Sequence, residues 1–324
     1  ITIKDIEKNN IIQSLVKDTI ENTSKNITIR ELNFEYKLES KKISENEAII
    51  WFKIKEVSKE NANNISQMNF LSNLIHEFKT PLNLIFSSMQ LLNKKIENNN
   101  ISNKDINKYL NIINQNSYRM LKLVNNIVDN SKIETGYDEY NPVNYDIVSF
   151  VENICDSIDS FIKLNNMTLI FDTDVEELIV AFDMEKIERI ILNLISNAIK
   201  FRKESQGKIL LTILSDNEFI SIVVRDTGIG ISNENISKIF GKYIRLNDER
   251  SIIKEGTGIG LSLVESLVKL HGGSVSVDSS FGNWTEFVVK IPNIKSNEKS
   301  EYTTKLNELD RVEKIKIEFS DIYK

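Results

Sequence analysis

The chain has 324 residues, which is enough for two or three domains of ordinary size, each with a buried core. Apolar residues make up 40% and charged residues 27%, as in soluble globular proteins, and the formal net charge is -6. This acidic balance, without any clustered basic stripe, argues against a dedicated nucleic-acid binder, because such proteins neutralise phosphates with Lys and Arg.

Cysteine and histidine are scarce. The one cysteine, Cys155, allows no intramolecular disulfide, and it fits a reducing compartment. Two histidines and one cysteine cannot build an ordinary structural zinc site. No run of about 18 apolar residues occurs, so we expect no membrane span within the chain. The chain starts at Ile1 without a signal peptide. We therefore expect a cytoplasmic fragment of a longer protein, and the missing part could hold membrane helices that keep it at the cytoplasmic face of a membrane.

The N-terminal region combines a short helical pattern with two strand-like segments. A short helical pattern covers Ile6 to Ile20. Two strands are predicted at Ile29–Leu38 and Ala48–Val57, joined by a polar turn around Glu45 and Asn46, because apolar residues alternate in both.

From about Lys59 the apolar pattern becomes that of long helices. Apolar residues of the first helix are spaced alternately by four and three: Leu71, Ile75, Phe78, Leu82, Ile85, Met89, Leu92 and Ile96. The second helix has the same spacing: Ile106, Leu110, Ile113, Ser117, Met120, Val124, Ile127 and Ser131. Ser102 and Asp105 are spaced as a capping box before it, and Gly136 suits a C-terminal cap. Two antiparallel helices cannot bury one apolar seam each without a partner, so we expect a homodimer that forms a four-helix bundle.

Pro142 opens a third region in which helices and strands alternate. Helices are predicted at 146–164, 183–201 and 259–271, and strands at 167–172, 178–182, 208–214, 218–225, 274–279 and 285–291. This mixture predicts an α/β sandwich. A polar stretch follows Pro292, and Val312–Phe319 then alternates like a strand.

The first long helix carries a candidate nucleophile, His76, in the segment Phe70–Leu82. His76 lies one residue off the apolar seam, so its ring should project into solvent, with Thr80 one turn along the same face. Pro81 removes a backbone hydrogen bond and is expected to kink the helix. A neutral imidazole has one nitrogen with a free lone pair, and a carboxylate such as Glu77 could fix its tautomer. The residues alone leave an ordinary surface histidine as an equal alternative.

Glycines gather in one window. Nine of the eleven lie between Gly228 and Gly282, which predicts close approach of the backbone to a ligand such as phosphate. Gly256, Gly258 and Gly260 precede an apolar helix, and a helix N-terminus fed by glycines is an anion site. The pattern is not the G-x-G-x-x-G fingerprint, because Leu261 takes the last place, and no P-loop sequence occurs.

Further polar residues flank this window. Asn193 and Asn197 are four apart and share one helix face, although a solvated face is an alternative reading. Asp226 ends an apolar strand just before Gly228, where a turn-forming aspartate is a common alternative. His271 closes a helix, and we interpret it as structural because no G-x-S-x-G elbow occurs.

Five motifs together resemble those of the sensor histidine kinases. His76-Glu-Phe-Lys-Thr-Pro-Leu82 resembles their phosphoacceptor motif, and Glu188–Phe201 resembles their asparagine motif. Asp226-Thr-Gly-Ile-Gly230 and Gly256-Thr-Gly-Ile-Gly260-Leu261 resemble their two glycine motifs, and Ile239-Phe-Gly-Lys-Tyr243 resembles the phenylalanine motif of their ATP lid. The resemblance covers roughly residues 60–292.

The resemblance implies a role for each matching residue. It implies that Asn197 coordinates Mg²⁺, which prefers oxygen ligands, that Asn193 shares the network, and that Lys200 points toward phosphate. Asp226 would accept a hydrogen bond from the adenine amino group. The remaining nucleotide contacts implied are Phe201, Gly228, Gly230, Gly256, Thr257, Gly258, Gly260, Leu261 and Thr285.

The chain departs from the family at Trp284, where glycine is usual, which puts the local backbone conformation in question. Thr285, beside it, is retained. Arg245 and Arg250 of the lid segment could reach phosphate, although solvated charges are the simpler interpretation.

The expected organisation is therefore multidomain: an all-α antiparallel hairpin followed by an α/β sandwich that binds ATP. Residues 1–58 would be a linker or part of a sensory PAS domain, 59–137 the dimerisation and phosphotransfer hairpin, 138–293 the ATP-binding domain, and 294–324 a tail with a strand.

The expected activity is transfer of the γ-phosphoryl group from ATP with Mg²⁺ to His76, with Glu77 as base or orienter, and then to an aspartate of a response regulator. Thr80 could hold a water for the reverse hydrolysis, or only cap backbone near Pro81. Two alternatives remain open: an ATP-binding scaffold without kinase activity, and a serine kinase acting on a partner protein.

Overall fold

The computed structural model describes most of the chain, in two compact units. The described residues are 24–31, 34–44, 47–56, 59–98, 101–203, 206–241, 258–296 and 308–322, with side chains from Ser72 onward except 134 and 308–310. The first unit is Ile1–Asn73 and the second is Leu74–Lys324.

The first unit contains a three-stranded antiparallel sheet. Its strands are β1 (Ser24–Glu31), β2 (Phe34–Ser44) and β3 (Glu47–Glu56), in that order. The predicted second strand is confirmed as β3. The predicted first strand, Ile29–Leu38, is wrong in its bounds, because it includes the end of β1 and the start of β2. The predicted helix at 6–20 and the turn at 45–46 lie outside the described residues.

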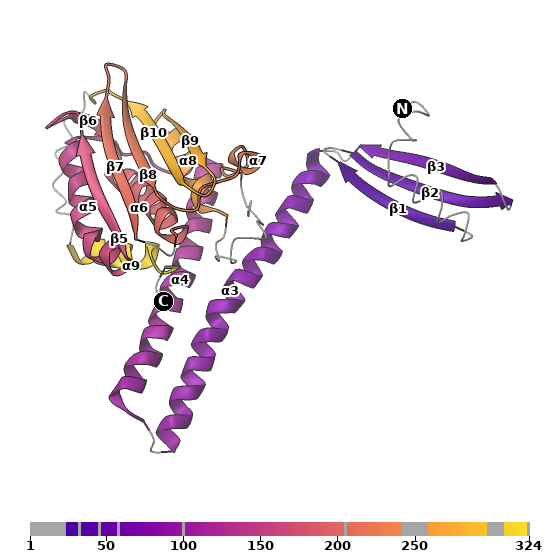
Figure 1. The fold of residues 1–324 in the computed structure, drawn as a ribbon, viewed down its shortest axis with the longest axis horizontal. Coiled ribbons are helices and arrows are strands. Elements are labelled where there is room, and N and C mark those ends of the chain that lie inside the picture. Colours follow the sequence, from indigo (N-terminus) through magenta and orange to yellow (C-terminus); the bar gives the residue numbers. More distant parts are fainter. Residues whose placement is uncertain are drawn as a thin grey trace. The chain divides into compact units, whose positions relative to one another are not determined.

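Two long helices form the hairpin that the sequence predicts (Figure 1). They are α3 (Lys59–Glu97), which begins in the first unit, and α4 (Asn103–Thr135). The predicted capping box is present, since Ser102 Oγ accepts from Asp105 N at 3.1 Å. Gly136 ends α4 at φ +69°. An ion pair of 2.7 Å between Lys95 Nζ and Asp105 Oδ1 joins the helices at the turn end.

The predicted apolar seams are only half buried in the single chain. Alternate members are exposed on α3 and on α4, whereas the members between them are half-buried. The exposed set is Ile75, Leu82, Met89 and Ile96 on α3, and Leu110, Ser117, Val124 and Ser131 on α4. One half of each seam therefore turns inward, and the other half forms an exposed stripe along the hairpin.

The rest of the second unit is the predicted α/β sandwich. Its five-stranded sheet has the order β5 (Met167–Thr173), β7 (Gly207–Ser215), β8 (Phe219–Asp226), β10 (Trp284–Pro292) and β9 (Ser274–Ser280). Only β5 and β7 are parallel. A separate ribbon pairs β4 (Val143–Asp146) with β6 (Ile179–Phe182). The sequence did not predict β4 or the short α7 (Asn233–Ile236).

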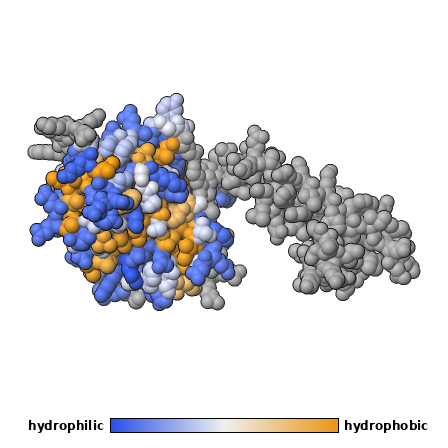
Figure 2. Space-filling view, turned by 90° about the horizontal axis from the view of Figure 1, so that it is seen from above, coloured by the Kyte–Doolittle hydropathy of each residue, from blue (hydrophilic) through white to orange (hydrophobic). Residues whose placement is uncertain are grey.

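Three helices cover one face of the sheet (Figure 1). They are α5 (Ile147–Leu164), α6 (Met184–Lys200) and α8 (Gly260–Leu270), each within two residues of its predicted bounds. Asp146 caps α5 and Asp183 caps α6 through side-chain hydrogen bonds to backbone N–H groups. The helices and the inner face of the sheet share one hydrophobic core. On the surface seen in Figure 2, hydrophobic residues lie in separate groups between hydrophilic ones.

A final helix, α9 (Glu308–Glu318), replaces the strand that the sequence predicted at Val312–Phe319. That prediction is wrong. The buried residues Ile315, Phe319 and Ile322 are spaced by four and three, which is one face of a helix and its following turn. The alternation of Ile315, Ile317 and Phe319 was compatible with both periods, and packing decides between them.

Among the helices of the described residues, none is both long and apolar enough to cross a membrane.

Candidate functional site

His76 lies on α3 with its side chain exposed. Thr80 Oγ1 donates a hydrogen bond of 3.3 Å to the carbonyl oxygen of His76, one turn earlier. Pro81 is buried, and α3 continues through it to Glu97. Glu77, the neighbouring carboxylate, is half-buried. The predicted exposure of the imidazole is confirmed, so a phosphoryl donor can reach it from solvent.

The two asparagines lie together on α6, as their spacing predicts. Asn197 Nδ2 donates to Asn193 Oδ1 over 3.4 Å, and Asn193 Nδ2 donates to Glu318 Oε1 over 3.4 Å. Both bonds are long, so they orient the amides more than they stabilise the fold. Within the described part of the chain, Asn197 Oδ1 is left as an oxygen for a ligand.

Asp226 ends β8 in a buried position. Its Oδ1 accepts a hydrogen bond of 2.7 Å from Gly228 N. Burial raises the pKa of this carboxyl to about 6, against the opposing effects of the Gly228 bond and of Lys203. The carboxylate is thus held by one backbone donor in a site that otherwise disfavours charge, and a second donor from a ligand would stabilise it.

Glycine is required at two points of the loop after Asp226. A Cβ on Gly228 would lie 2.6 Å from the carbonyl oxygen of Phe201. Gly230 has φ +68° and packs on the backbone of Ser280 and Phe281. Ile229 N also donates to the Phe201 carbonyl oxygen at 3.0 Å. The loop is therefore fixed to the C-terminal end of α6, where Phe201 is the cap residue.

Thr285 lies directly opposite Asp226 in the β10–β8 pairing and is also buried. Its hydroxyl is 3.1 Å from Ser279 Oγ, and Ser279 Oγ also accepts from Ile231 N at 2.8 Å. Ser279 was not predicted from the sequence, because only the strand register brings it to this site. It links Thr285 to the first glycine loop.

Trp284 is accommodated without special backbone geometry. It begins β10, where extended backbone suits any residue, and the positive φ of +80° falls at Gly282 instead. The Arg225 guanidinium lies 4.4 Å from the centre of the Trp284 ring. The departure from the family pattern therefore does not disturb Thr285.

The second glycine motif approaches the asparagines. Gly258 has φ +67°, and a Cβ on Gly260 would lie 2.8 Å from Asn193 Oδ1. Since α8 begins at Gly260, its N-terminal turn lies against Asn193. Leu261 is half-buried beside it. Gly256, Thr257, Arg245 and Arg250 lie outside the described residues, as does the rest of segment 242–257.

Lys200 is the last residue of α6, and its Nζ lies 5.7 Å from the centre of the Phe201 ring. His271 is structural, as predicted. Its Nδ1 is 2.8 Å from the Leu267 carbonyl oxygen, and its Nε2 accepts from Asp183 N at 3.3 Å. Burial lowers the pKa of His271, which keeps the ring neutral.

Contacts link these positions, from the asparagines of α6 through the two glycine motifs to the paired ends of β8 and β10. The amide oxygen of Asn197 suits a hard cation such as Mg²⁺. No cluster of three or more His, Cys, Asp or Glu side chains that could hold a metal occurs among the described residues. The donor set therefore fits an ion that takes its other ligands from nucleotide phosphates and water.

Two family models match the chain. Residues 66–136 match the His Kinase A (phospho-acceptor) domain. Residues 182–295 match the family described as histidine kinase-, DNA gyrase B-, and HSP90-like ATPase.

Curated relatives agree with these matches. Histidine kinase P4 of Formosa agariphila is 30% identical over 234 residues, which cover 71% of this chain and 17% of that protein. Sensor histidine kinase WalK of Bacillus subtilis is 29% identical over 242 residues, which cover 74% of this chain and 39% of that protein. The chain thus spans well under half the length of either relative.

Solved structures share the fold. The histidine kinase AdeS of Acinetobacter baumannii has a TM-score of 0.50 at 20% identity, covering 67% of this chain and 97% of that one. The histidine kinase ThkA, solved in complex with the response regulator protein TrrA, has a TM-score of 0.52 at 18% identity, covering 90% of this chain and 87% of that one. Along the chain, the phosphoacceptor match is followed by the ATPase match. The chain belongs to the sensor histidine kinases of two-component systems.

Proposed function

We propose that this chain autophosphorylates on His76 with ATP and Mg²⁺ and then passes the phosphoryl group to an aspartate of a response regulator. The observation that carries the proposal is the exposed imidazole of His76 within the matched phosphoacceptor hairpin. Asp226, Thr285, Asn193, Asn197 and the glycine loops would hold the nucleotide.

In this reaction a ring nitrogen of neutral His76 attacks the γ-phosphorus, and the bond from that phosphorus to the β,γ-bridging oxygen breaks, so ADP leaves. The other ring nitrogen becomes a stronger acid as the bond forms, and Glu77 is the adjacent group that would take up its proton or orient the ring. A bound Mg²⁺, held by Asn197, would supply charge neutralisation at the phosphates. Lys200 would add a second positive charge, and the rest of the catalysis would be positioning.

The exposed apolar stripe of the hairpin supports a homodimer. Ile75, at 66% exposure, and Met89, at 46%, would be buried when two hairpins form a four-helix bundle. The partner aspartate would belong to a receiver domain, as the complex of ThkA with TrrA illustrates for that kinase. We place this activity in the cytoplasm, with any membrane attachment made by segments outside this chain.

Thr80 remains a candidate for the reverse hydrolysis of the phosphorylated regulator. Its hydroxyl is exposed, yet it already donates to the His76 carbonyl oxygen. That bond supports the backbone-capping interpretation, and a water held by the remaining lone pairs would be needed for hydrolysis.

The test is labelling with γ-³²P-ATP. The wild-type chain should gain an acid-labile, base-stable label, and His76→Gln should gain none. The only other histidine is buried His271, so retained label in that variant would contradict the proposal. No label on the wild type would favour an ATP-binding scaffold, and an acid-stable label on a partner protein would favour a serine kinase.

A further inference from the structure

The C-terminal segment 308–322 joins the hairpin to the ATP-binding domain, and it lies beyond the residues 182–295 that match the ATPase family. Helix α9 contacts both α4 and α6 (Figure 1). Phe319 is fully buried and stacks on Phe161 of α5, with ring centres 4.6 Å apart. Ile315 and Ile322 are buried in the same core. The segment is therefore an integral part of the second unit rather than a loose tail.

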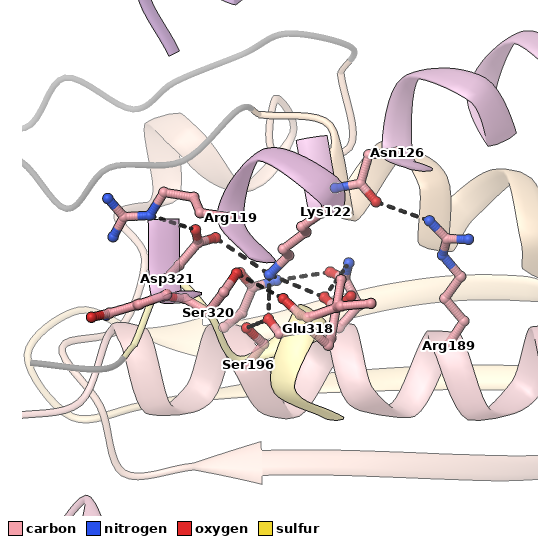
Figure 3. A network of polar contacts seen from close by, with 12 residues as sticks. Arg119, Lys122, Asn126, Arg189, Ser196, Glu318, Ser320 and Asp321 are labelled. Atoms are coloured by element: carbon pink, nitrogen blue, oxygen red, sulfur yellow. Dashed lines mark hydrogen bonds and ion pairs between the residues drawn. The ribbon is translucent and has the colours of Figure 1, made fainter. Parts of the chain in front are cut away.

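On the α4 side, the segment makes a network of ion pairs (Figure 3). Lys122 Nζ lies 3.2 Å from Glu318 Oε1 and 3.3 Å from Asp321 Oδ2, and it donates to the Glu318 carbonyl oxygen. Arg119 Nε lies 3.3 Å from Asp321 Oδ1. Burial lowers the pKa of Lys122, but the two carboxylates outweigh it and raise that pKa above its usual value. Lys122 thus stays charged in a buried position only because α9 is docked.

On the α6 side, the same segment reaches the nucleotide residues. Glu318 Oε1 accepts from Asn193 Nδ2, and Ser196 Oγ donates to the Glu318 carbonyl oxygen at 3.3 Å. Burial raises the pKa of Asp321, but Lys122, Lys200 and Arg119 outweigh it and lower that pKa. Lys200, at the end of α6, thus places positive charge near Asp321 in the docked state.

A further ion pair secures the middle of α9. Arg311 Nε donates to Glu188 Oε1 at 3.0 Å, and Glu188 is only 3% exposed on α6. Lys314 Nζ lies 3.5 Å from the other oxygen of Glu188. Since a buried carboxylate without partners is costly, these cations favour the docked position of α9.

Lys122, the α4 residue that pairs with segment 308–322, lies at about the same level along the hairpin as His76. His76 is 21 residues before the end of α3, and Lys122 is 19 residues after the start of α4. In an antiparallel hairpin these positions are at about the same level along the axis. Docked α9 thus holds α6 against the hairpin next to the part of α3 that contains His76.

We propose that segment 308–322 is an autoinhibitory strut, which holds the ATP-binding domain against α4 and engages Asn193 and Lys200 with its own carboxylates. This inference rests on the proposed kinase function, because inhibition refers to transfer to His76. Nucleotide phosphates and the strut compete for Lys200 and for the orientation of Asn193. By thermodynamic reciprocity, docking of α9 weakens nucleotide binding by the same factor by which nucleotide weakens docking.

The first test removes the two carboxylates without changing their shape. The double variant Glu318→Gln/Asp321→Asn should bind the Mg²⁺ complex of a non-hydrolysable ATP analogue at least about fivefold more tightly, and should autophosphorylate faster by a similar factor. Glu313→Gln makes the same chemical change at an exposed position of α9 and should alter neither quantity. Equal or weaker binding by the double variant would overturn the proposal, provided its thermal unfolding shows that the domain is folded.

The second test uses the unmodified chain. Saturating analogue should speed amide hydrogen exchange in 308–322 at least about fivefold while slowing exchange around Asp226 and Gly228. Slower or unchanged exchange in 308–322, with protection at Gly228, would overturn the strut. The kinase proposal is tested independently of this result. If it fails, His76 carries no label, whatever the hydrogen-exchange result.

Discussion

The hairpin and the ATP-binding domain bury their apolar surface in different ways. The domain closes its own core, since Phe182, Ile191 and Ile195 are fully buried within one chain. The hairpin leaves alternate members of its seams exposed, including Ile75 and Met89. The domain can therefore fold as a self-contained body, whereas the stability of the hairpin should depend on a second copy and on protein concentration.

The largest expected effect comes from opening the core of the domain. Phe182 is fully buried, and its ring centre lies 5.3 Å from that of Phe150. Phe182→Ala should lower the free energy of unfolding by about 3–5 kcal/mol, through lost transfer energy and the cavity left behind. Urea unfolding followed by Trp284 fluorescence in a Trp51→Phe background would measure it. A loss below about 1 kcal/mol would show that this core is less consolidated than its burial indicates.

The hairpin should respond differently to a change in its exposed stripe. Met89→Glu places a charge in the stripe, so it should weaken dimerisation about 10- to 100-fold, because burying a side chain of this size contributes about 1.5–3 kcal/mol. Sedimentation equilibrium measures the effect, and nucleotide binding should be retained. Gln90→Glu, at the adjacent exposed position outside the stripe, is the control. Unchanged dimerisation of Met89→Glu would place the dimer interface elsewhere.

Within the domain, Asp226 should affect folding stability and nucleotide binding in opposite directions. Its pKa of about 6 in the folded state exceeds the ordinary value of 3.8, so the folded state binds protons more strongly than the unfolded chain. The group therefore lowers stability as pH rises from about 4 to 6, and the cost persists above that window. Asp226→Asn removes this cost and should raise the free energy of unfolding at pH 8 by up to about 3 kcal/mol, with no difference from wild type near pH 4.

The same substitution should weaken nucleotide binding about tenfold or more at pH 8, because a charge-assisted hydrogen bond becomes a neutral one. Wild-type affinity should fall as pH drops through about 6, while the affinity of the variant should stay flat. Unfolding curves and nucleotide titrations at pH 4.5, 6 and 8 would measure both quantities. A parallel pH profile for wild type and variant would assign the titration to another group.

The contrast between the regions also explains what the sequence could predict. Local periodicity located α5, α6, α8 and the strands of the main sheet to within about two residues, because their apolar faces match the period of each element. The capping box at Ser102 and the structural role of His271 also followed from neighbouring residues.

Long-range pairing was not predictable in the same way. Ser279 meets Thr285 only through strand register, and Glu318 meets Asn193 across 125 residues of sequence. The three apolar residues at 315, 317 and 319 fit either period, so α9 was wrongly predicted as a strand. Likewise, the heptads identified both seams but not which half of each would face inward, because that depends on how the two helices pack.

The last comparison uses a matched pair of glycines, one from each region, and the smallest effect is expected at the one in the hairpin. Gly136 and Gly230 have nearly the same φ, +69° and +68°, but nothing lies within 4 Å of a Cβ on Gly136, whereas one on Gly230 would meet the backbone of Ser280. Gly136→Ala should therefore cost only the conformational term, about 1 kcal/mol, in thermal unfolding of the hairpin, and Gly136→Asn should cost less. Gly230→Ala must also displace the loop beside Asp226, so it should abolish nucleotide binding. If both alanine variants lost only about 1 kcal/mol and kept nucleotide affinity, close packing would not be what distinguishes the domain from the hairpin.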